Sequence, residues 1–104
     1  MSRKTDLLRG LPPVHPGALL REDVLPNVSM TKSDIAAALG VSRAQLYAVL
    51  SEKAPVTAAM ALRLGKFFGN GPELWLNMQS NYDLEILRKT MAHDLAHIPR
   101  ARAT

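Results

Sequence analysis

Apolar residues recur every three or four positions along most of this 104-residue chain, a spacing that predicts helices. The first periodic stretch opens at Pro16, because proline is accommodated in the first turn of a helix. Leu20 and Val24 follow four residues apart on one face, and Pro26 ends the stretch. The alternating pattern of a half-buried strand is not found anywhere in the sequence.

Two short helices are predicted next, over residues 31–39 and 42–50. Thr31 and Ser42 are residues that cap helix N-termini, and Gly40 suits the left-handed position after a helix end. The apolar positions of the two helices have helical spacing and are Ile35, Ala36 and Leu39, followed by Leu46, Val49 and Leu50.

Two longer helices complete the pattern. Thr57 caps the fourth, whose predicted buried face comprises Met60, Leu64, Phe67 and Phe68. Gly69 and Gly71 end it, and Pro72 opens the fifth. These elements predict an all-α protein with five helices in one domain over residues 14–92, whose last helix is extended. Residues 1–13 are expected to be a mobile arm, and residues 93–104 a C-terminal tail.

The turn between the two short helices, within residues 32–51, is too brief for an antiparallel pair, so these helices must cross steeply. A steep crossing requires a small residue where the backbones approach, and Ala36 stands there. Gly40 supplies the positive φ of the turn, while Val41 and Leu46 fill the angle. This order of residues resembles the DNA-binding helix-turn-helix, although an ordinary helical corner can share it.

In such a motif the second helix enters the major groove with its N-terminal end first. Arg43 suits guanine, Gln45 suits adenine, and an alanine can touch the thymine methyl group. The predicted base contacts are Arg43, Ala44, Gln45, Tyr47 and Ala48. Arg43 could instead be solvated or contact a phosphate, and Gln45 could contact no base. Helix N-termini and nearby lysines are expected to anchor phosphates, through Thr31, Lys32, Ser42, Lys53 and Thr57.

The fifth helix carries an apolar face that a small monomer does not readily cover. Its residues are Leu74, Trp75, Met78, Tyr82 and Ile86. This face predicts an interface, and a two-fold dimer formed through it would place two recognition helices about 34 Å apart. The alternative is that the face packs on the fourth helix of the same chain.

Composition narrows the classes of function. The chain is 47% hydrophobic and has no cysteine, which excludes disulfides, thiolate zinc sites and a catalytic thiol. A net charge of +4 permits binding to nucleic acid without establishing it. No apolar run is long enough to span a membrane and no signal peptide opens the chain, so we expect a cytoplasmic protein without membrane contact.

Candidate chemistry is sparse. His93 and His97 have the spacing of zinc-binding histidines on a helix, but Asp94 stands where a zinc protease carries its catalytic glutamate. His15 is expected to order the start of the first helix. The sequence has no phosphate-binding glycine loop, nucleophile elbow or paired carboxylates in a plausible cleft. We therefore predict no metal, no cofactor and no enzymatic activity.

Several blocks together resemble the HigA-type antitoxins of the XRE, or lambda-repressor-like, helix-turn-helix group. The resemblance spans roughly residues 14–84, and its most distinctive part lies in the fifth helix. The blocks are His15-Pro16-Gly17, Leu20-Arg21-Glu22-Asp23, Ile35-Ala36, Leu39-Gly40-Val41-Ser42-Arg43, Met60-Ala61-Leu62-Arg63-Leu64, Phe68-Gly69, Trp75-Leu76-Asn77-Met78-Gln79 and Tyr82-Asp83-Leu84.

The resemblance implies a homodimer that binds double-stranded operator DNA, represses its own operon and neutralises a RelE/HigB-like mRNA-cleaving toxin. The chain departs from the family at Ser51-Glu52-Lys53, where an Asn-Gly turn commonly follows the recognition helix. Two alternatives remain open at this point: a stand-alone XRE repressor without a toxin, and a helical interaction module that has lost DNA binding.

Overall fold

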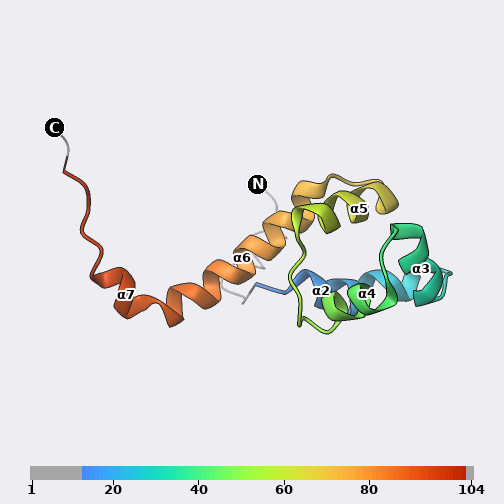
Figure 1. Cartoon of the computed structure of the whole chain (residues 1–104), viewed down its shortest axis with the longest axis horizontal. Helices are drawn as coiled ribbons and strands as arrows, with labels where there is room; N and C mark the ends of the chain where they lie inside the picture. Colours follow the sequence, from blue (N-terminus) through green and yellow to red (C-terminus); the bar gives the residue numbers. More distant parts are fainter. Residues whose placement is uncertain (1–12, 103–104) are drawn as a thin grey trace, which may run out of the picture.

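The protein is all-helical over residues 13–102, which the computed structural model describes (Figure 1). This architecture confirms the predicted fold class. The prediction of a mobile N-terminal arm falls almost entirely on residues 1–12, which lie outside the described range. The elements in chain order are α2 (Pro16–Leu19), η1 (Leu20–Val24), η2 (Leu25–Asn27), α3 (Lys32–Leu39), α4 (Arg43–Leu50), α5 (Ala58–Phe68), α6 (Pro72–Thr90) and α7 (Ala92–Ala96).

The first predicted helix is built from three segments of different pitch. α2 is α-helical, η1 is π-helical and η2 is a 3-10 turn. His15 caps the start of α2, because its Nδ1 accepts a hydrogen bond from the backbone N–H of Gly17 at 2.9 Å. This contact agrees with the expectation that His15 orders the beginning of the helix. Pro26 lies within η2.

The core lies between α2–η1, α3, α4, α5 and the first half of α6. Its largest fully buried side chains include Leu20, Ile35, Leu46, Leu64 and Trp75. Each of the five comes from a different predicted helix, and all of them come from the apolar positions of the helical pattern. Burying such side chains stabilises the fold by roughly 1.5–3 kcal/mol each.

The prediction that Trp75 belongs to a dimer interface is wrong. Its side chain is only 2% exposed and packs against the Phe68 ring at a centroid distance of 5.9 Å, while its Nε1 donates to Asn70 Oδ1 at 3.2 Å. Tyr82 is also partly covered, because its ring meets that of His15 edge-on at 5.0 Å. At Trp75 the face therefore packs on the fourth predicted helix of the same chain, as the alternative proposed, whereas Leu74 and Ile86 remain exposed.

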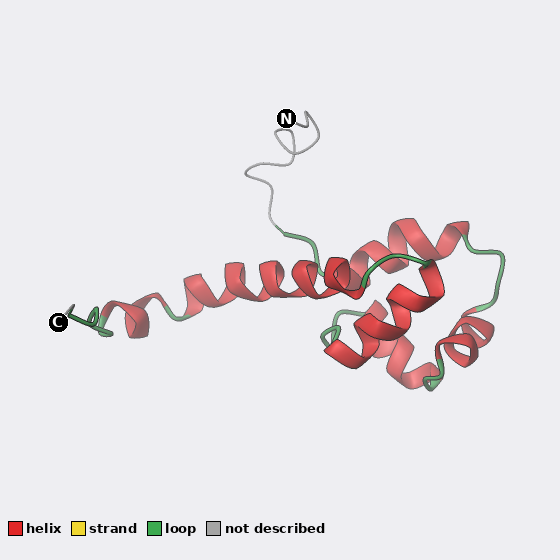
Figure 2. Cartoon of the chain, turned by 90° about the horizontal axis from the view of Figure 1, so that it is seen from above, coloured by secondary structure: helices red, strands yellow, loops and turns green. Residues whose placement is uncertain are grey.

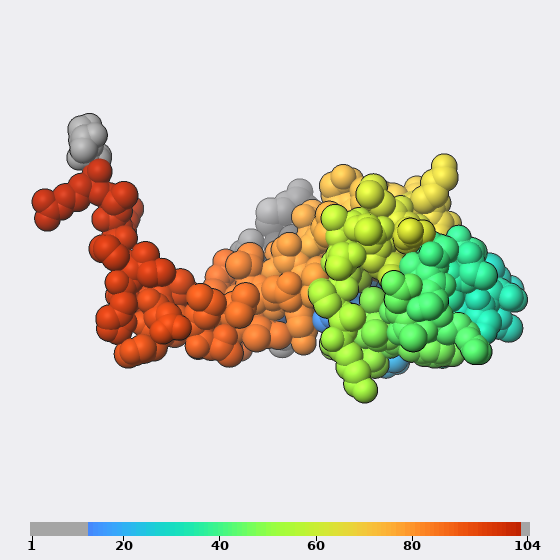
Figure 3. Space-filling view, in the orientation of Figure 1, coloured from blue at the N-terminus to red at the C-terminus, as the bar shows by residue number. Residues whose placement is uncertain are grey.

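The C-terminal part of α6 leaves the body and α7 follows after a bend, so that the two project together from one end of the molecule (Figures 1 and 2). We call residues 84–98 the helical arm. The space-filling view shows that the arm stands clear of the body (Figure 3). Helical structure thus continues past residue 92, the predicted end of the domain. The exposed large apolar side chains of the helical arm are Leu84, Ile86, Leu87, Met91, Leu95 and Ile98.

No helix within residues 13–102 is both long and apolar enough to cross a membrane.

Candidate nucleic-acid interface

The corner between α3 and α4 has the predicted geometry. Gly40 ends α3 in the left-handed conformation, with φ 74°, and its N–H donates to the carbonyls of Ala36 and Ala37. Ala36 is buried at the crossing and Leu46 is buried beneath α4, while Val41 is half-buried against the core. The corner therefore presents α4 at the surface of the molecule.

Arg63 of α5 supports this corner from below. Its Nη1 donates to the carbonyl of Leu39 at 2.8 Å, at the negative end of the α3 dipole. A Cβ placed on Gly40 would lie 2.6 Å from the same nitrogen, in addition to the strain of its positive φ. Glycine at this position is therefore required chiefly by the backbone conformation, because the tip of the flexible Arg63 side chain can shift.

The N-terminus of α4 is closed by a reciprocal capping box. The hydroxyl of Ser42 accepts from the N–H of Gln45 at 3.0 Å, and Gln45 Oε1 accepts from the N–H of Ser42 at 2.8 Å. The sequence signal for this box is the Ser-x-x-Gln spacing. The prediction that Gln45 contacts a base overlooked that signal. The box restricts that predicted role: pairing with adenine requires both ends of the amide, and Oε1 is already engaged.

The outer face of α4 carries the predicted base contacts. Arg43, Ala44, Gln45 and Tyr47 are exposed, and Ala48 is half-buried. Arg43 Nη1 lies 3.4 Å from Ser33 Oγ, a long contact on the surface. Tyr47 is 48% exposed, and Lys32 Nζ lies 5.9 Å from its ring centroid. None of these side chains is turned into the core.

Two of the predicted phosphate contacts border a hollow beside α4. The hollow has a volume of about 560 Å³ and is lined by Arg21, Lys32, Ala44, Tyr47, Ala48, Leu50, Ser51 and Lys53. Lys32 and Lys53 give this hollow positive charge.

The other predicted phosphate contacts cap helices. Thr31, Ser42 and Thr57 each accept an N–H at the start of their helix, and all three are exposed. Thr57 lies on a second, smaller hollow of about 180 Å³ together with Gln45 and Arg63. Lys32 and Lys53 thus line one hollow and Thr57 the other, whereas Thr31 and Ser42 line neither.

The turn after α4 has a left-handed backbone position that usually holds glycine, although no glycine is present there. Glu52 has φ 64°, and it is the only non-glycine residue with positive φ within residues 13–102. Its N–H donates to the Val49 carbonyl at 3.0 Å, and the N–H of Lys53 donates to the Ala48 carbonyl at 2.9 Å. These two bonds form a Schellman ending, in which the left-handed position usually holds glycine. The departure from the family's Asn-Gly turn therefore leaves the backbone of the turn intact.

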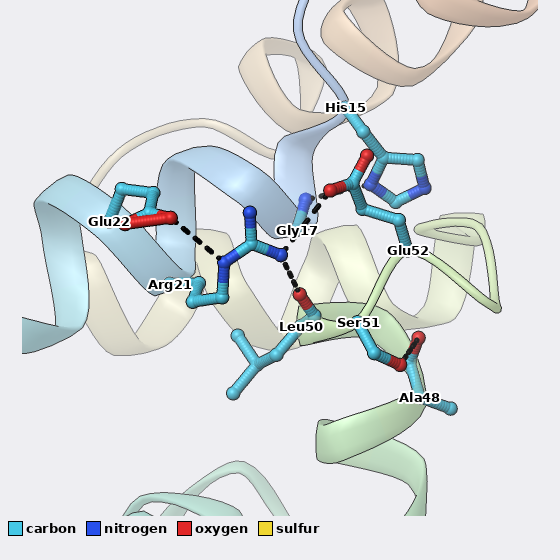
Figure 4. Close-up of polar contacts among 8 residues, drawn as sticks. All are labelled: His15, Gly17, Arg21, Glu22, Ala48, Leu50, Ser51 and Glu52. Atoms are coloured by element: carbon cyan, nitrogen blue, oxygen red, sulfur yellow. Dashed lines mark hydrogen bonds and ion pairs between the residues drawn. The ribbon is translucent and has the colours of Figure 1, made fainter.

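Arg21 holds this turn from η1 (Figure 4). Its Nη1 donates to the Leu50 carbonyl at 2.7 Å and lies 3.3 Å from Glu52 Oε2, while its Nε pairs with Glu22 Oε1 at 3.1 Å. Hydrogen bonds to the Glu22 and Glu52 carboxylates raise the pKa of Arg21 above its ordinary value, so the guanidinium stays charged. Nothing in the sequence pattern indicated this contact, because it joins residues 29 positions apart.

Gln79 is a second residue whose role the sequence pattern did not indicate. It is buried, its Oε1 accepts from the N–H of Val56 at 2.8 Å, and its Nε2 donates to Asp83 Oδ1 at 3.0 Å. It thereby ties the loop after the recognition helix to α6. A lone polar residue on an otherwise apolar helix face was the available signal.

Within residues 13–102, no group of three or more His, Cys, Asp or Glu side chains could hold a metal ion. The rings of His93, in α7, and His97, directly after it, lie 4.6 Å apart, and both residues are exposed.

Comparison with known proteins identifies relatives that match most of the chain. No protein-family model matches the chain. It is 40% identical over 76 residues to virulence-associated protein I of Dichelobacter nodosus, covering 73% of this chain and 70% of that protein. It is 36% identical over 72 residues to antitoxin HigA-1 of Vibrio cholerae, covering 69% and 68%.

A solved structure extends the likeness to three dimensions. Pseudomonas aeruginosa antitoxin HigA, determined with the higBA promoter, superposes with a TM-score of 0.77 at 30% identity. The match covers 88% of this chain and 99% of that one. Two of these relatives are antitoxins, in agreement with the prediction of a protein that is not an enzyme.

Proposed function

This chain belongs to the HigA-type antitoxins with an XRE-group helix-turn-helix, and on that premise we propose that it binds operator DNA and represses its own toxin–antitoxin operon. The observation that supports the proposal most directly is the exposed outer face of α4, with Lys32 and Lys53 beside it. An α-helix with this exposure fits the major groove, and lysines at its margins suit the flanking phosphates.

Base reading then depends mainly on Arg43. Its guanidinium can donate two hydrogen bonds to guanine, since its contact with Ser33 is long and exposed. Ala44 and Ala48 offer methyl groups to thymine, and Tyr47 adds an exposed ring. Gln45, held by the capping box, still has its Nε2 to donate to a base acceptor.

The proposed partner protein is a RelE/HigB-like mRNA-cleaving toxin, which the chain would neutralise by binding. This part of the proposal is supported by the family and by the likeness to an antitoxin solved with a toxin–antitoxin promoter. An antitoxin that represses its operon acts where the DNA is, which places it in the bacterial cytoplasm.

We further propose that the chain acts as a homodimer, because a single short helix reads few base pairs and two-fold operators match two-fold proteins. Leu74 and Ile86 of the predicted dimer face remain exposed, and Met78 and Tyr82 are half-buried. Sedimentation of the wild-type chain and of Ile86→Glu tests this face; an unchanged dimer in the variant would place the interface elsewhere.

Footprinting on the promoter region of the chain's own operon, with binding measured against salt, tests DNA recognition. A protected site whose affinity falls steeply with rising salt is the expected result. Absent or salt-independent binding would contradict the proposal and favour a helical interaction module.

Co-purification with the product of the neighbouring gene tests the toxin. A stable complex that suppresses mRNA cleavage supports an antitoxin. Specific DNA binding without any such complex would favour a stand-alone repressor.

A further inference from the structure

We propose that Arg21 is a positioning residue for DNA recognition: it fixes the C-terminal end of α4 without itself touching DNA. The inference rests on the proposed DNA-binding function. It follows from the contacts of one guanidinium that reaches from η1 to the last turn of the recognition helix (Figure 4).

The contact with the helix end is directional. The Leu50 carbonyl is one of the last four of α4, which have no partner within the helix and carry the negative end of its dipole. A charged donor at 2.7 Å satisfies that carbonyl and opposes the dipole. Arg21 therefore restrains both the position and the direction of the axis of α4 at this end.

The second contact restrains the turn that follows. Glu52 holds a left-handed conformation that costs a residue with a side chain about 1–2 kcal/mol, and its carboxylate meets Arg21 at 3.3 Å. The ion pair connects the strained residue to η1. One arginine thus links the last carbonyl of α4, the turn after it and the first helical segment.

The local geometry around Arg21 is unusual for a surface arginine. It lies in a π-helical segment, a conformation that is rare and concentrated at functional positions. One turn earlier in the chain, Gly17 lies against the backbone of α4 at Val49. The first segment therefore contacts the recognition helix at two successive points, one by close packing and one by charge.

Charge balance argues against a direct phosphate contact. Arg21 lines the hollow beside α4, but Glu22 and Glu52 both pair with its guanidinium. A phosphate would meet two carboxylates there. Lys32 and Lys53 line the same hollow and form no ion pair within residues 13–102, so they are the cations available to DNA.

The test compares Arg21→Lys and Arg21→Ala with Lys53→Ala, a matched variant that removes a cation from the same hollow. Each is titrated with the promoter duplex and with a random duplex over a range of salt. Arg21→Lys keeps the charge but cannot hold two acceptors in one plane. We expect both Arg21 variants to bind the promoter roughly 3- to 30-fold more weakly, with random-duplex affinity and salt slope unchanged.

Lys53→Ala should instead weaken both duplexes and reduce the salt slope by about 1. If Arg21→Ala behaves in that way and Arg21→Lys binds like the wild type, Arg21 contacts a phosphate and the proposal is overturned. Wild-type affinity in both Arg21 variants would overturn it as well.

Hydrogen exchange of the free protein separates this inference from the proposed function. The amides of Glu52 and Lys53, which bond to α4 carbonyls, should exchange faster in Arg21→Lys than in Lys53→Ala or the wild type. Equal exchange rates would show that Arg21 does not hold the helix end. A wild-type chain that fails to discriminate the promoter would contradict the proposed function alone.

Discussion

Gly17 of α2 packs directly against the backbone carbonyl of Val49 in α4, closer than any side chain would permit. Gly17→Ala must therefore push the first segment and the recognition helix apart, at a cost of about 1–3 kcal/mol or more. Denaturant unfolding measures this cost, and amide chemical shifts along α4 report the displacement.

Gly69→Ala is the control for that prediction. Gly69 has φ 76°, but a Cβ added there would meet no atom within 4 Å, so only backbone strain opposes the alanine. We expect a loss of about 1 kcal/mol and unchanged shifts in α4. Equal losses and equal shift changes in the two variants would mean that the Gly17 contact is not specific.

At position 52 we expect glycine to give a more stable protein than alanine, the reverse of the order found inside helices. Glu52→Gly and Glu52→Ala both lose the ion pair with Arg21, but only glycine relieves the positive φ. The glycine variant should be the more stable by about 1 kcal/mol. Ala37→Gly, at an exposed position inside α3, should be destabilised by about 1 kcal/mol. A less stable Glu52→Gly would argue against the left-handed turn.

The capping box predicts a difference between two replacements of Gln45. Gln45→Ala loses the side-chain acceptor for the Ser42 N–H and should destabilise the protein by about 0.5–1 kcal/mol. Gln45→Glu retains an acceptor beside the positive end of the helix dipole and should unfold near the wild-type midpoint. Thermal or urea unfolding of both proteins decides the matter, and equal destabilisation would contradict the box.

Arg43→Ala should weaken binding to the promoter by about 1–3 kcal/mol and relax the preference at one base pair. The expectation follows from the exposed position of Arg43 on the first turn of α4. Titrations with single-base variants of the footprinted site provide the measurement. Equal losses on promoter and random duplex would mean that Arg43 contacts a phosphate.

Trp75→Ala should cost about 3–5 kcal/mol, because the ring is buried within its own chain. The loss should be the same at low and high protein concentration, as measured by urea unfolding. Ile86→Ala, at a 42% exposed position of the same helix, should change the stability of a monomer by less than about 0.5 kcal/mol. A loss at Trp75 that depends on concentration would restore this residue to an interface between copies.

Helix positions and the corner could be predicted because their signals are local. The cap at Ser42, the glycine at the end of α3 and the apolar spacing of α4 all act within a few residues. The pitch changes in the first segment escaped prediction because apolar spacing does not distinguish α, π and 3-10 pitch over so few residues. The burial of Trp75 did as well, since apolar spacing reveals a buried face but not what covers it.

The candidate site also has a part that the sequence predicted and a part that it did not. That α4 presents its outer face to solvent followed from which of its residues are apolar. The roles of Arg21 and Gln79 did not, because each is defined by a carbonyl or N–H more than 20 positions away in the chain. Backbone groups leave no trace in a residue pattern, so contacts to them appear only with coordinates.

The helical arm projects from one end of the molecule, whereas α4 lies within the body beside α2 (Figure 1). Changes to one can therefore accumulate without altering the other. The proposed dimer face reaches this arm only at Ile86, so a chimaera that carries the arm of a related chain on this body should keep the base preferences of α4 while changing dimerisation through that residue. Such separation would let a duplicated gene become insulated from its parent through a few arm substitutions, long before its DNA specificity diverged.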